Sequence, residues 1–153
     1  KNNYAILRYF NVVGSIHNFK VIKKINSLFD KVYYSIKKKN YKININGSSN
    51  DTKDGTPERD FIHMHDLCNI HNKIYGYLKK NKKIILNCGS GKRYSVLEVI
   101  RAFEQKIKRK FYITYKITNP DETQTICSDN SLLKELFRQD VTKKKIYSLI
   151  KNY

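Results

Sequence analysis

The sequence predicts an α/β fold in which strands and helices alternate along 153 residues. Short apolar runs that end at glycine or other turn residues are typical of buried strands, and Tyr4 to Phe10 is the first of them. Between such runs, apolar residues recur at helical spacing, and Ser95 with Glu98 forms the capping-box pattern of a helix start. No internal repeat or low-complexity linker divides the chain, so we expect a single unit over residues 1–153.

The N-terminal elements follow from hydrophobic spacing. The first strand ends in Asn11-Val12-Val13-Gly14, and apolar residues at three- and four-residue intervals predict an amphipathic helix over Ile22 to Lys37. Ile43 to Asn46 alternates apolar and polar residues and stops at Gly47, as a short edge strand does.

A second strand and helix follow a tight turn. The Asp54-Gly55 pair supplies the turn, and the period-two run from Arg59 to His63 predicts the strand. Asp66 is expected to lie ahead of the next helix. The apolar face of that helix has five members, Leu67, Ile70, Ile74, Tyr77 and Leu78.

The hydrophobic pattern that predicts the remaining elements becomes less distinct toward the C-terminus. Four are expected: a buried strand at Ile84–Leu86 that ends at Gly89-Ser90-Gly91, a helix at Val96–Lys106 with Ser95 as its N-cap, a strand at Tyr112–Thr118, and a short helix around Leu132–Phe137 capped by Asp129 or Ser131. From Val141 on, a weak helical pattern carries no site chemistry.

The chain is strongly basic, with 31 Lys and Arg against 13 Asp and Glu and a net charge of +18. Such an excess is typical of nucleic-acid binding. Here 25 of the 31 cations are Lys, scattered through a chain also rich in Asn, Ile and Tyr, as in proteins of AT-rich genomes. Several Lys runs fall at predicted helix ends, where they favour the helix dipole. We therefore expect no dedicated nucleic-acid function, although the positive field also suits a small anionic ligand.

The spacing of the cysteines and histidines does not match the pattern of a metal site. Cys68, Cys88 and Cys127 lie far apart, which favours reduced thiols in the cytosol. Three of the four histidines, His63, His65 and His71, are interpreted as helix-start and packing residues. No apolar stretch approaches the ~20 residues of a membrane helix, so we expect a cytoplasmic protein without a membrane partner.

Five collinear segments resemble UDP-glucose 4-epimerases and related nucleotide-sugar enzymes of the extended short-chain dehydrogenase/reductase family. They are Leu7–Gly14 (LRYFNVVG), Asp54–Leu67 (DGTPERDFIHMHDL), Leu86–Gly91 (LNCGSG), Tyr94–Phe103 (YSVLEVIRAF) and Cys127–Leu136 (CSDNSLLKEL). The resemblance covers about residues 4 to 137. It implies a Rossmann-type fold, of which this chain forms the C-terminal part: the last strands of the NAD-binding sheet, interleaved with a small substrate-binding α/β lobe.

The resemblance assigns roles near the first strand and helix. Tyr9 and Phe10 would approach the nicotinamide of NAD, and Asn11 would hydrogen-bond the UDP-sugar. From the residues alone, a plain turn residue is the favoured reading of Asn11. Ser27 and Leu28 fall where the family contacts the nucleotide diphosphate, with a register that can slip by one.

The resemblance also assigns residues that would contact the nucleotide. Asn44, Ile45 and Asn46 match the strand that holds the uracil edge, and an amide suits a pyrimidine because it both donates and accepts. Arg59 would bind the diphosphate, since a guanidinium offers two parallel charge-assisted donors. A charged surface hairpin is the alternative for the Arg59 segment taken by itself.

One segment departs from the family. Where the family carries P-R-R-x-G-D, this chain reads Ile117 to Glu122 (ITNPDE), so Asn119 replaces an Arg that binds pyrophosphate. Glu122 or Asp121 must serve for the Asp that binds ribose, and we assign Glu122. Loss of a charge-assisted diphosphate contact costs ~1.5 to 3 kcal/mol, unless a nearby Lys compensates.

The family's catalytic and cofactor-cradling motifs are absent. The chain has no G-x-x-G-x-x-G turn for the NAD pyrophosphate. The Tyr-x-x-x-Lys spacings at Tyr33, Tyr34, Tyr75, Tyr112 and Tyr147 are attributed to chance, because the family places its catalytic pair before the L-R-Y-F-N strand. We therefore assign no catalytic residue.

The resemblance implies a function for the whole enzyme: NAD-dependent interconversion of UDP-glucose and UDP-galactose through a 4-keto sugar. The implied partner of this chain is a UDP-sugar, and whole enzymes of the family are often homodimers. We expect no redox step from this part alone, and we expect the strands at Tyr4–Phe10 and Ile84–Cys88 to lack parallel neighbours. Three alternatives stay open: a degraded remnant, a related nucleotide-sugar epimerase or dehydratase, and a basic nucleic-acid-binding module.

Overall fold

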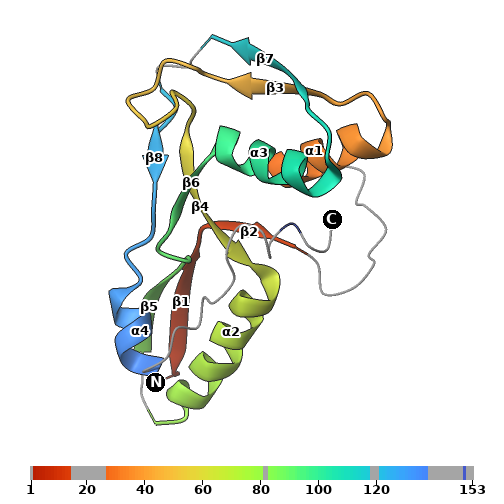
Figure 1. Ribbon diagram of the computed structural model, residues 1–153. Coiled ribbons are helices and arrows are strands. Elements are labelled where there is room, and N and C mark those ends of the chain that lie inside the picture. The colour runs from red at the N-terminus through yellow and green to blue at the C-terminus, as the bar shows by residue number, and fades with distance from the viewer. Residues whose placement is uncertain (1, 15–26, 81–82, 118–120, 138–149, 151–153) are drawn as a thin grey trace.

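The computed structural model in Figure 1 describes residues 2–14, 27–80, 83–117, 121–137 and 150. The α/β prediction is confirmed, because strands and helices alternate along these residues. The elements are β1 (Tyr4–Tyr9), β2 (Asn11–Val13), α1 (Leu28–Lys37), β3 (Lys42–Asn46), β4 (Glu58–His63), α2 (Met64–Leu78), β5 (Lys83–Cys88), β6 (Arg93–Ser95), α3 (Val96–Ile107), β7 (Tyr112–Lys116), β8 (Thr125–Ile126) and α4 (Ser131–Phe137). Asn119, the segment 22–26 and the helical pattern from Val141 lie outside the described residues, Ile150 excepted.

The strands form three small sheets. β1 pairs with β5 in parallel, β3 pairs with β7 in parallel, and β4 lies between β2 and β6 and also pairs with β8. The predicted strand from Tyr4 to Phe10 is confirmed as β1 to within one residue, and a second short strand, β2, follows it. At Phe10 the chain leaves β5, and Asn11 pairs with Phe61 of β4 instead.

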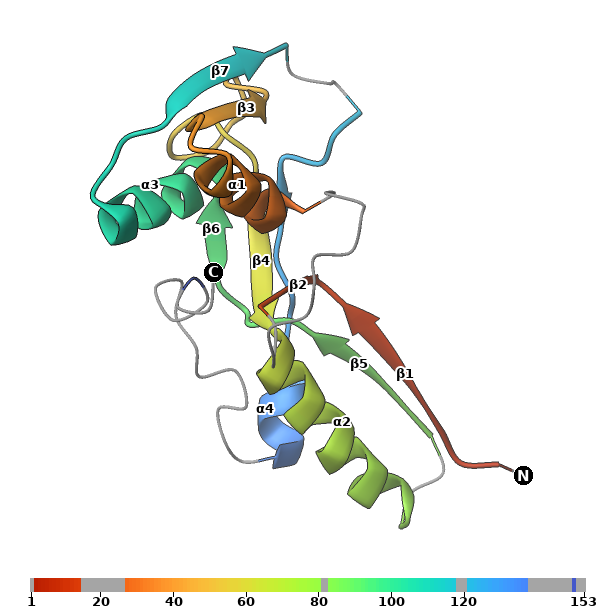
Figure 2. The ribbon, with the colours of Figure 1, turned by 90° about the vertical axis from the view of Figure 1, so that its right-hand side faces the viewer.

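The expectation that β1 and β5 lack parallel neighbours is wrong in one respect, because they pair with each other over six residues each. In Figure 2, α2 and α4 lie to the same side of this strand pair. On the other face, Ile6 is 47% exposed and its register partner Ile85 is 48% exposed. Parallel strands normally bury both faces, so this face differs from an ordinary parallel sheet.

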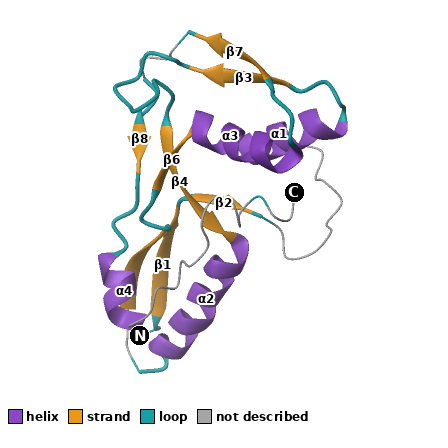
Figure 3. Ribbon diagram, in the orientation of Figure 1, coloured by secondary structure: helices purple, strands orange, loops and turns teal. Residues whose placement is uncertain are grey.

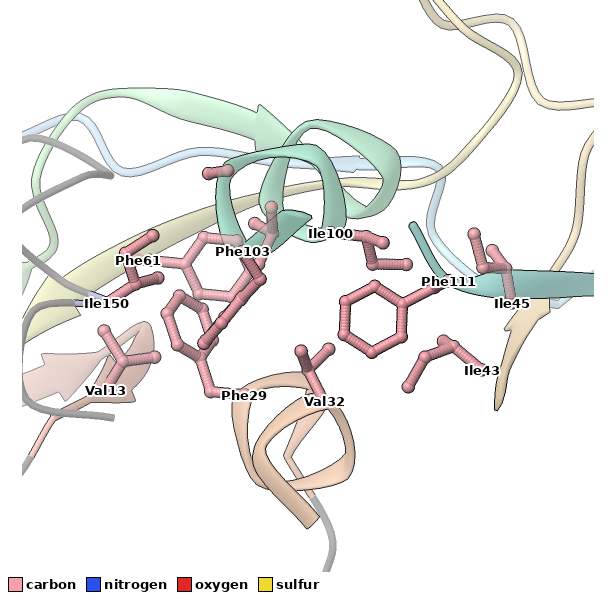
Figure 4. Packing of buried hydrophobic residues seen from close by; sticks show 12 residues of the cluster. Val13, Phe29, Val32, Ile43, Ile45, Phe61, Ile100, Phe103, Phe111 and Ile150 are labelled. Atoms are coloured by element: carbon pink, nitrogen blue, oxygen red, sulfur yellow. The ribbon is translucent and has the colours of Figure 1, made fainter. Parts of the chain in front are cut away.

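The upper hydrophobic core lies among α1, α3, β3 and β4. Figure 3 shows the two helices side by side below β3 and β7. Phe29 packs edge-to-face against Phe61 at 5.3 Å and Phe103 at 5.6 Å between ring centroids. As Figure 4 shows, Val32 lies beside Phe29, and the cluster continues through Phe111 to Ile43 and Ile45 at its other end. This dense packing fixes α1 and α3 against β4.

The lower core lies between α2 and the β1–β5 pair. Ile62 of β4 packs there with Ile70, Leu86 and Leu133, all fully buried. Cys88 is also in this core, where burial raises the pKa of its thiol to about 11. The thiol therefore acts as a small apolar group at a position where the sequence motif of the family carries Leu. Because Phe61 enters the upper core and its neighbour Ile62 the lower one, β4 joins the two.

Two helix starts differ from the prediction. Ser27 has extended backbone and its side chain accepts a hydrogen bond from the Asp30 amide, so α1 begins at Leu28 instead of running unbroken from Ile22. The side chain of His63 accepts a hydrogen bond from the His65 amide, so α2 begins at Met64 and Asp66 lies inside its first turn. The Ser95–Glu98 capping box of α3 is confirmed, with both reciprocal hydrogen bonds present.

The other end of α3 is held by a buried carboxylate. Glu104 is 4% exposed and accepts from the Phe111 amide at 2.8 Å, from Arg101 at 2.7 Å and from Lys110 at 3.3 Å. Burial acts to raise the pKa of this carboxyl, but the hydrogen bonds from Arg101, Phe111 and Lys110 outweigh it and lower the pKa below its usual value. The ionised form therefore stabilises the joint between α3 and the chain leading to β7.

Replacing Glu104 by Gln is expected to lower the free energy of unfolding at pH 7 by about 1 to 3 kcal/mol, since a charge-accepting group for three donors is lost. Because the folded-state pKa is depressed, this stabilisation is present above the unfolded pKa and is lost as the pH falls through the folded value. The difference between variant and wild type should thus shrink below about pH 4.5 in urea titrations. Glu135→Gln, on the exposed face of α4, is the control; an equal loss in both variants would contradict this account.

Candidate functional site

A cavity of about 290 Å³ opens between the start of α1 and strands β2 and β4. Five of the residues predicted to bind ligand line it: Asn11, Ser27, Leu28, Arg59 and Glu122. The rest of its described wall is formed by Val12, Val13, Phe29, Pro57, Phe61 and Val96. We call this space the Arg59 cavity. Its mostly apolar wall with a few convergent polar groups is typical of small-molecule sites.

Arg59 is held in place by its own strand and by the segment that leads into β8. Its Nη1 donates to the carbonyl of Glu58 at 2.9 Å and to that of Gln124 at 3.0 Å, and its Nη2 donates to Glu122 Oε1 at 2.9 Å. The Arg59 side chain is 14% exposed. Residues 122–124 are fixed in turn because β8 pairs with Glu58 and Arg59 in parallel. The guanidinium is therefore preorganised at the cavity wall.

The start of α1 adds a second feature that favours anions. Ser27 and Leu28 line the cavity, and they are the N-cap and the first residue of this ten-residue helix. The helix dipole places partial positive charge at that end. The helix is directed there because Phe29 and Val32 bury its apolar face in the upper core. Arg59 and the α1 N-terminus thus meet at one cavity.

The Asp54-Gly55-Thr56 segment forms a turn that contacts the N-terminal end of α3. Asp54 accepts hydrogen bonds from the Thr56 amide at 2.9 Å and from the Ser95 hydroxyl at 2.5 Å. Burial acts to raise the pKa of Asp54, but these hydrogen bonds outweigh it and the pKa is lowered. Gly55 has φ +77°, and a Cβ there would lie 2.3 Å from the Ser48 carbonyl oxygen. The turn therefore requires glycine, and this part of the motif is structural.

Asp60, next to Arg59, organises the loops behind the cavity. Fully buried, its carboxylate accepts from the amide and hydroxyl of Ser90 at 2.8 and 2.6 Å, and from the Gly91 amide at 2.9 Å. It also accepts from the amide and hydroxyl of Ser128 at 3.1 and 2.5 Å. We call Asp60, Ser90, Gly91 and Ser128 the Asp60 cluster. A Cβ on Gly89 would lie 2.5 Å from Asp60 Oδ2, so the close approach requires glycine there.

Residues 1–89 match the NAD dependent epimerase/dehydratase family. The chain belongs to this family. Among curated relatives, it is 35% identical to the UDP-glucose 4-epimerase of Pasteurella multocida over 137 residues, which is 85% of this chain and 40% of that protein. It is 34% identical to the UDP-glucose 4-epimerase of Haemophilus influenzae over 144 residues, which is 89% of this chain and 42% of that protein. The chain thus spans about two fifths of the length of these relatives.

Solved structures of epimerases agree with the family fold. The UDP-glucose 4-epimerase of Bifidobacterium longum in complex with NAD+ and UDP matches with a TM-score of 0.84 and 27% identity, over 98% of this chain and 46% of that one. The enzyme of Stenotrophomonas maltophila, with bound NAD and formylated UDP-arabinopyranose, matches with a TM-score of 0.89 over 98% and 46% of the two chains; at 24% identity it shows the fold alone.

The other residues assigned from the family resemblance lie outside the Arg59 cavity wall. Tyr9 is exposed at the end of β1, and its hydroxyl lies 2.7 Å from His71 Nε2. Phe10, half-buried, follows it at the point where the chain changes sheets. Their approach to a nicotinamide stays a prediction.

The side chains of Asn44, Ile45 and Asn46 alternate between the two faces of β3. Asn44 and Asn46 line a separate, open hollow with Lys31, Lys42 and Lys116, among others. Ile45 is buried in the upper core at 1% exposure, so only its backbone is available to a base. The role of these three residues in holding the nucleotide also stays a prediction.

Sequence reasoning missed the Asp60 cluster. The sequence predicts Gly89-Ser90-Gly91 as the end of a strand within one family segment and Ser128 as part of another, without indicating that they share a partner. The available signal was the Arg-Asp pair itself: in a period-two strand, a carboxylate beside a ligand-facing Arg must point to the opposite face. Among the described residues, no group of three or more His, Cys, Asp or Glu could hold a metal ion. None of the helices described is long and apolar enough to cross a membrane.

Replacing Asp60 by Asn is expected to lower the free energy of unfolding by about 2 to 4 kcal/mol, because the amide nitrogen turns a donor toward donors that are buried with it. Urea-induced unfolding would measure the change. Asp51→Asn, at an exposed position in the preceding loop, is the control and should change stability by less than about 0.5 kcal/mol. An unchanged midpoint for the Asp60 variant would show that the cluster does not hold the loops together.

Proposed function

We propose that this chain is the UDP-sugar-binding part of a UDP-glucose 4-epimerase and corresponds to the C-terminal part of the whole enzyme. The observation that carries the proposal is the Arg59 cavity, where an ordered guanidinium and a helix N-terminus meet among residues that the family resemblance independently assigns to the ligand. Two such features favour a diphosphate over a neutral sugar. The curated relatives that carry this name support the same choice.

Each residue in the cavity has a proposed task. Arg59 and the α1 N-terminus at Ser27 and Leu28 hold the diphosphate. Glu122 accepts hydrogen bonds from the ribose hydroxyls, and Asn11 bonds the sugar through its amide. The strand Asn44–Asn46 meets the uracil at the rim. The whole reaction would also need NAD, which supplies the hydride acceptor that interconverts UDP-glucose and UDP-galactose.

The described residues do not fit the greater part of an NAD site. Gly89-Ser90-Gly91 follows a strand, as a dinucleotide-binding turn does, but the amides of Ser90 and Gly91 already donate to Asp60. A strand, β6, follows this turn where a dinucleotide site has a helix N-terminus. Only Tyr9 and Phe10 are assigned to the cofactor here. We therefore derive no redox step from this chain, and we propose that the acid, base and cofactor cradle belong to other residues of the enzyme.

The exposed face of the β1–β5 pair fits the same proposal. Ile6 and Ile85 are directly opposed and about half exposed, on a parallel pair that helices cover from one side. A parallel sheet with both faces covered is the rule in Rossmann-type folds. We propose that further strands and helices of the dinucleotide-binding sheet complete this face in the whole enzyme.

Arg59→Gln is expected to weaken UDP binding by about tenfold to a hundredfold, since one charge-assisted diphosphate contact is lost. Uridine has no phosphate, so its weaker affinity should change little. Isothermal titration calorimetry with both ligands would measure this. Arg93→Gln removes the same charge from an exposed side chain outside the cavity and is the control. Equal UDP affinity for Arg59→Gln and wild type would refute the assignment of the diphosphate.

We expect the chain alone to show no turnover of UDP-galactose with added NAD, because no catalytic Tyr-Lys pair is assigned to it. Chromatographic separation of UDP-glucose from UDP-galactose after incubation would test this. Measurable conversion above a no-protein control would contradict it, and would place catalytic residues within this chain.

A further inference from the structure

The guanidinium of Arg59 is already paired with an anion of the chain itself. Its Nη2 lies 2.9 Å from Glu122 Oε1, while both bonds of Nη1 go to backbone carbonyls. Glu122 and Arg59 are the two charged residues among the described residues that line the cavity. Any phosphate that reaches Arg59 must therefore approach a carboxylate at the same time.

Glu122 is held at this position by its own segment. The next residues are tied to β4, because the Glu58 amide donates to the Gln124 carbonyl at 2.8 Å and Thr125 pairs with Glu58 in β8. The Gln124 side chain also accepts from the Asp51 amide at 3.0 Å. These contacts keep the backbone beside Glu122 close to Arg59, and the ion pair with Arg59 positions the carboxylate itself.

We propose that Glu122 is a specificity-determining residue, which selects ligands that bring hydroxyl donors beside a diphosphate and rejects ligands that bring phosphate alone. This rests on the proposed function, in which Arg59 holds the diphosphate. A nucleoside diphosphate offers Glu122 the ribose hydroxyls, so the carboxylate keeps hydrogen-bond partners when Arg59 turns to the phosphates. Inorganic pyrophosphate offers none, so it faces an uncompensated like charge.

The need for such selection follows from the charge of the chain. A net charge of +18 on the chain attracts polyanions in general. Attraction alone cannot distinguish a nucleotide sugar from pyrophosphate. A fixed carboxylate beside the phosphate-binding cation supplies the missing discrimination, because it penalises one class of anion and not the other.

The experiment measures the affinity of inorganic pyrophosphate and of UDP for wild type, Glu122→Gln, Glu122→Ala and Glu135→Gln by calorimetry. Glu122→Gln should bind pyrophosphate about fivefold to tenfold more tightly than wild type. Its UDP affinity should change less, since the amide oxygen still accepts from a hydroxyl, so the preference for UDP falls. Glu135→Gln removes the same charge from an exposed site on α4 and should change neither affinity beyond twofold.

Pyrophosphate binding by both Glu122 variants that is no tighter than that by wild type and Glu135→Gln would overturn the proposal. Circular dichroism of each variant shows whether it is folded, and Glu122→Ala provides the comparison where Glu122→Gln is not. The proposed function fails by a different result, namely UDP binding that does not depend on Arg59. The two failures are therefore distinguishable in the same set of titrations.

Discussion

The carboxylate of Asp60 is the interaction on which the arrangement of this protein most depends. It accepts hydrogen bonds from two loops that are far apart in sequence, at Ser90–Gly91 and at Ser128. A buried ionised carboxylate is stable only when it is fully hydrogen-bonded. The five donors meet this requirement, and in doing so they fix both loops to the centre of β4. The loop that ends at Ser128 also carries β8, which backs the ligand cavity.

Side chains along β4 point alternately to its two faces, and this connects the Asp60 cluster to the Arg59 cavity. Arg59 and Phe61 face the cavity and the upper core, whereas Asp60 and Ile62 face the loops and the lower core. Each side chain of the strand therefore has a different neighbour, and none can shift without the others. The guanidinium is preorganised for the same reason, because its carbonyl partners at Glu58 and Gln124 belong to segments that this strand holds. Preorganisation of this kind reduces the cost of binding.

Local patterns predicted the elements well where one physical rule decides the outcome. The capping box at Ser95 is confirmed because both hydrogen bonds are local. The strand predicted at Arg59–His63 is confirmed to within one residue, since β4 begins at Glu58. Two features were not predicted, for different reasons. The change of strand partner between Tyr9 and Asn11 depends on where β4 and β5 lie, which is a tertiary arrangement. The early start of α2 depends on a local contact, because the His63 side chain acts as its cap and histidine is not one of the residues preferred there. Of the site, the sequence indicated Arg59 and its cavity neighbours, but it could not indicate that Arg59 would be paired with Glu122, since 63 residues separate them.

The upper core and the β1–β5 pair differ in how far the described residues cover their apolar side chains. The upper core is formed by α1, α3 and β3 together with β4, and the hydrogen-bond partners of Arg59 at Glu58, Glu122 and Gln124 are described residues. The β1–β5 pair has an apolar row at Ile6 and Ile85 with no described helix against it. Complete burial of an exposed isoleucine contributes about 1.5 to 3 kcal/mol, so covering these half-exposed side chains contributes about half of that for each, which is still a useful part of the net stability of a domain. Under the proposed function, this energy favours association with the dinucleotide-binding half, while the substrate cavity already has its shape. Recognition of the substrate and chemistry on it would then reside in different parts of the enzyme, joined across the β1–β5 pair.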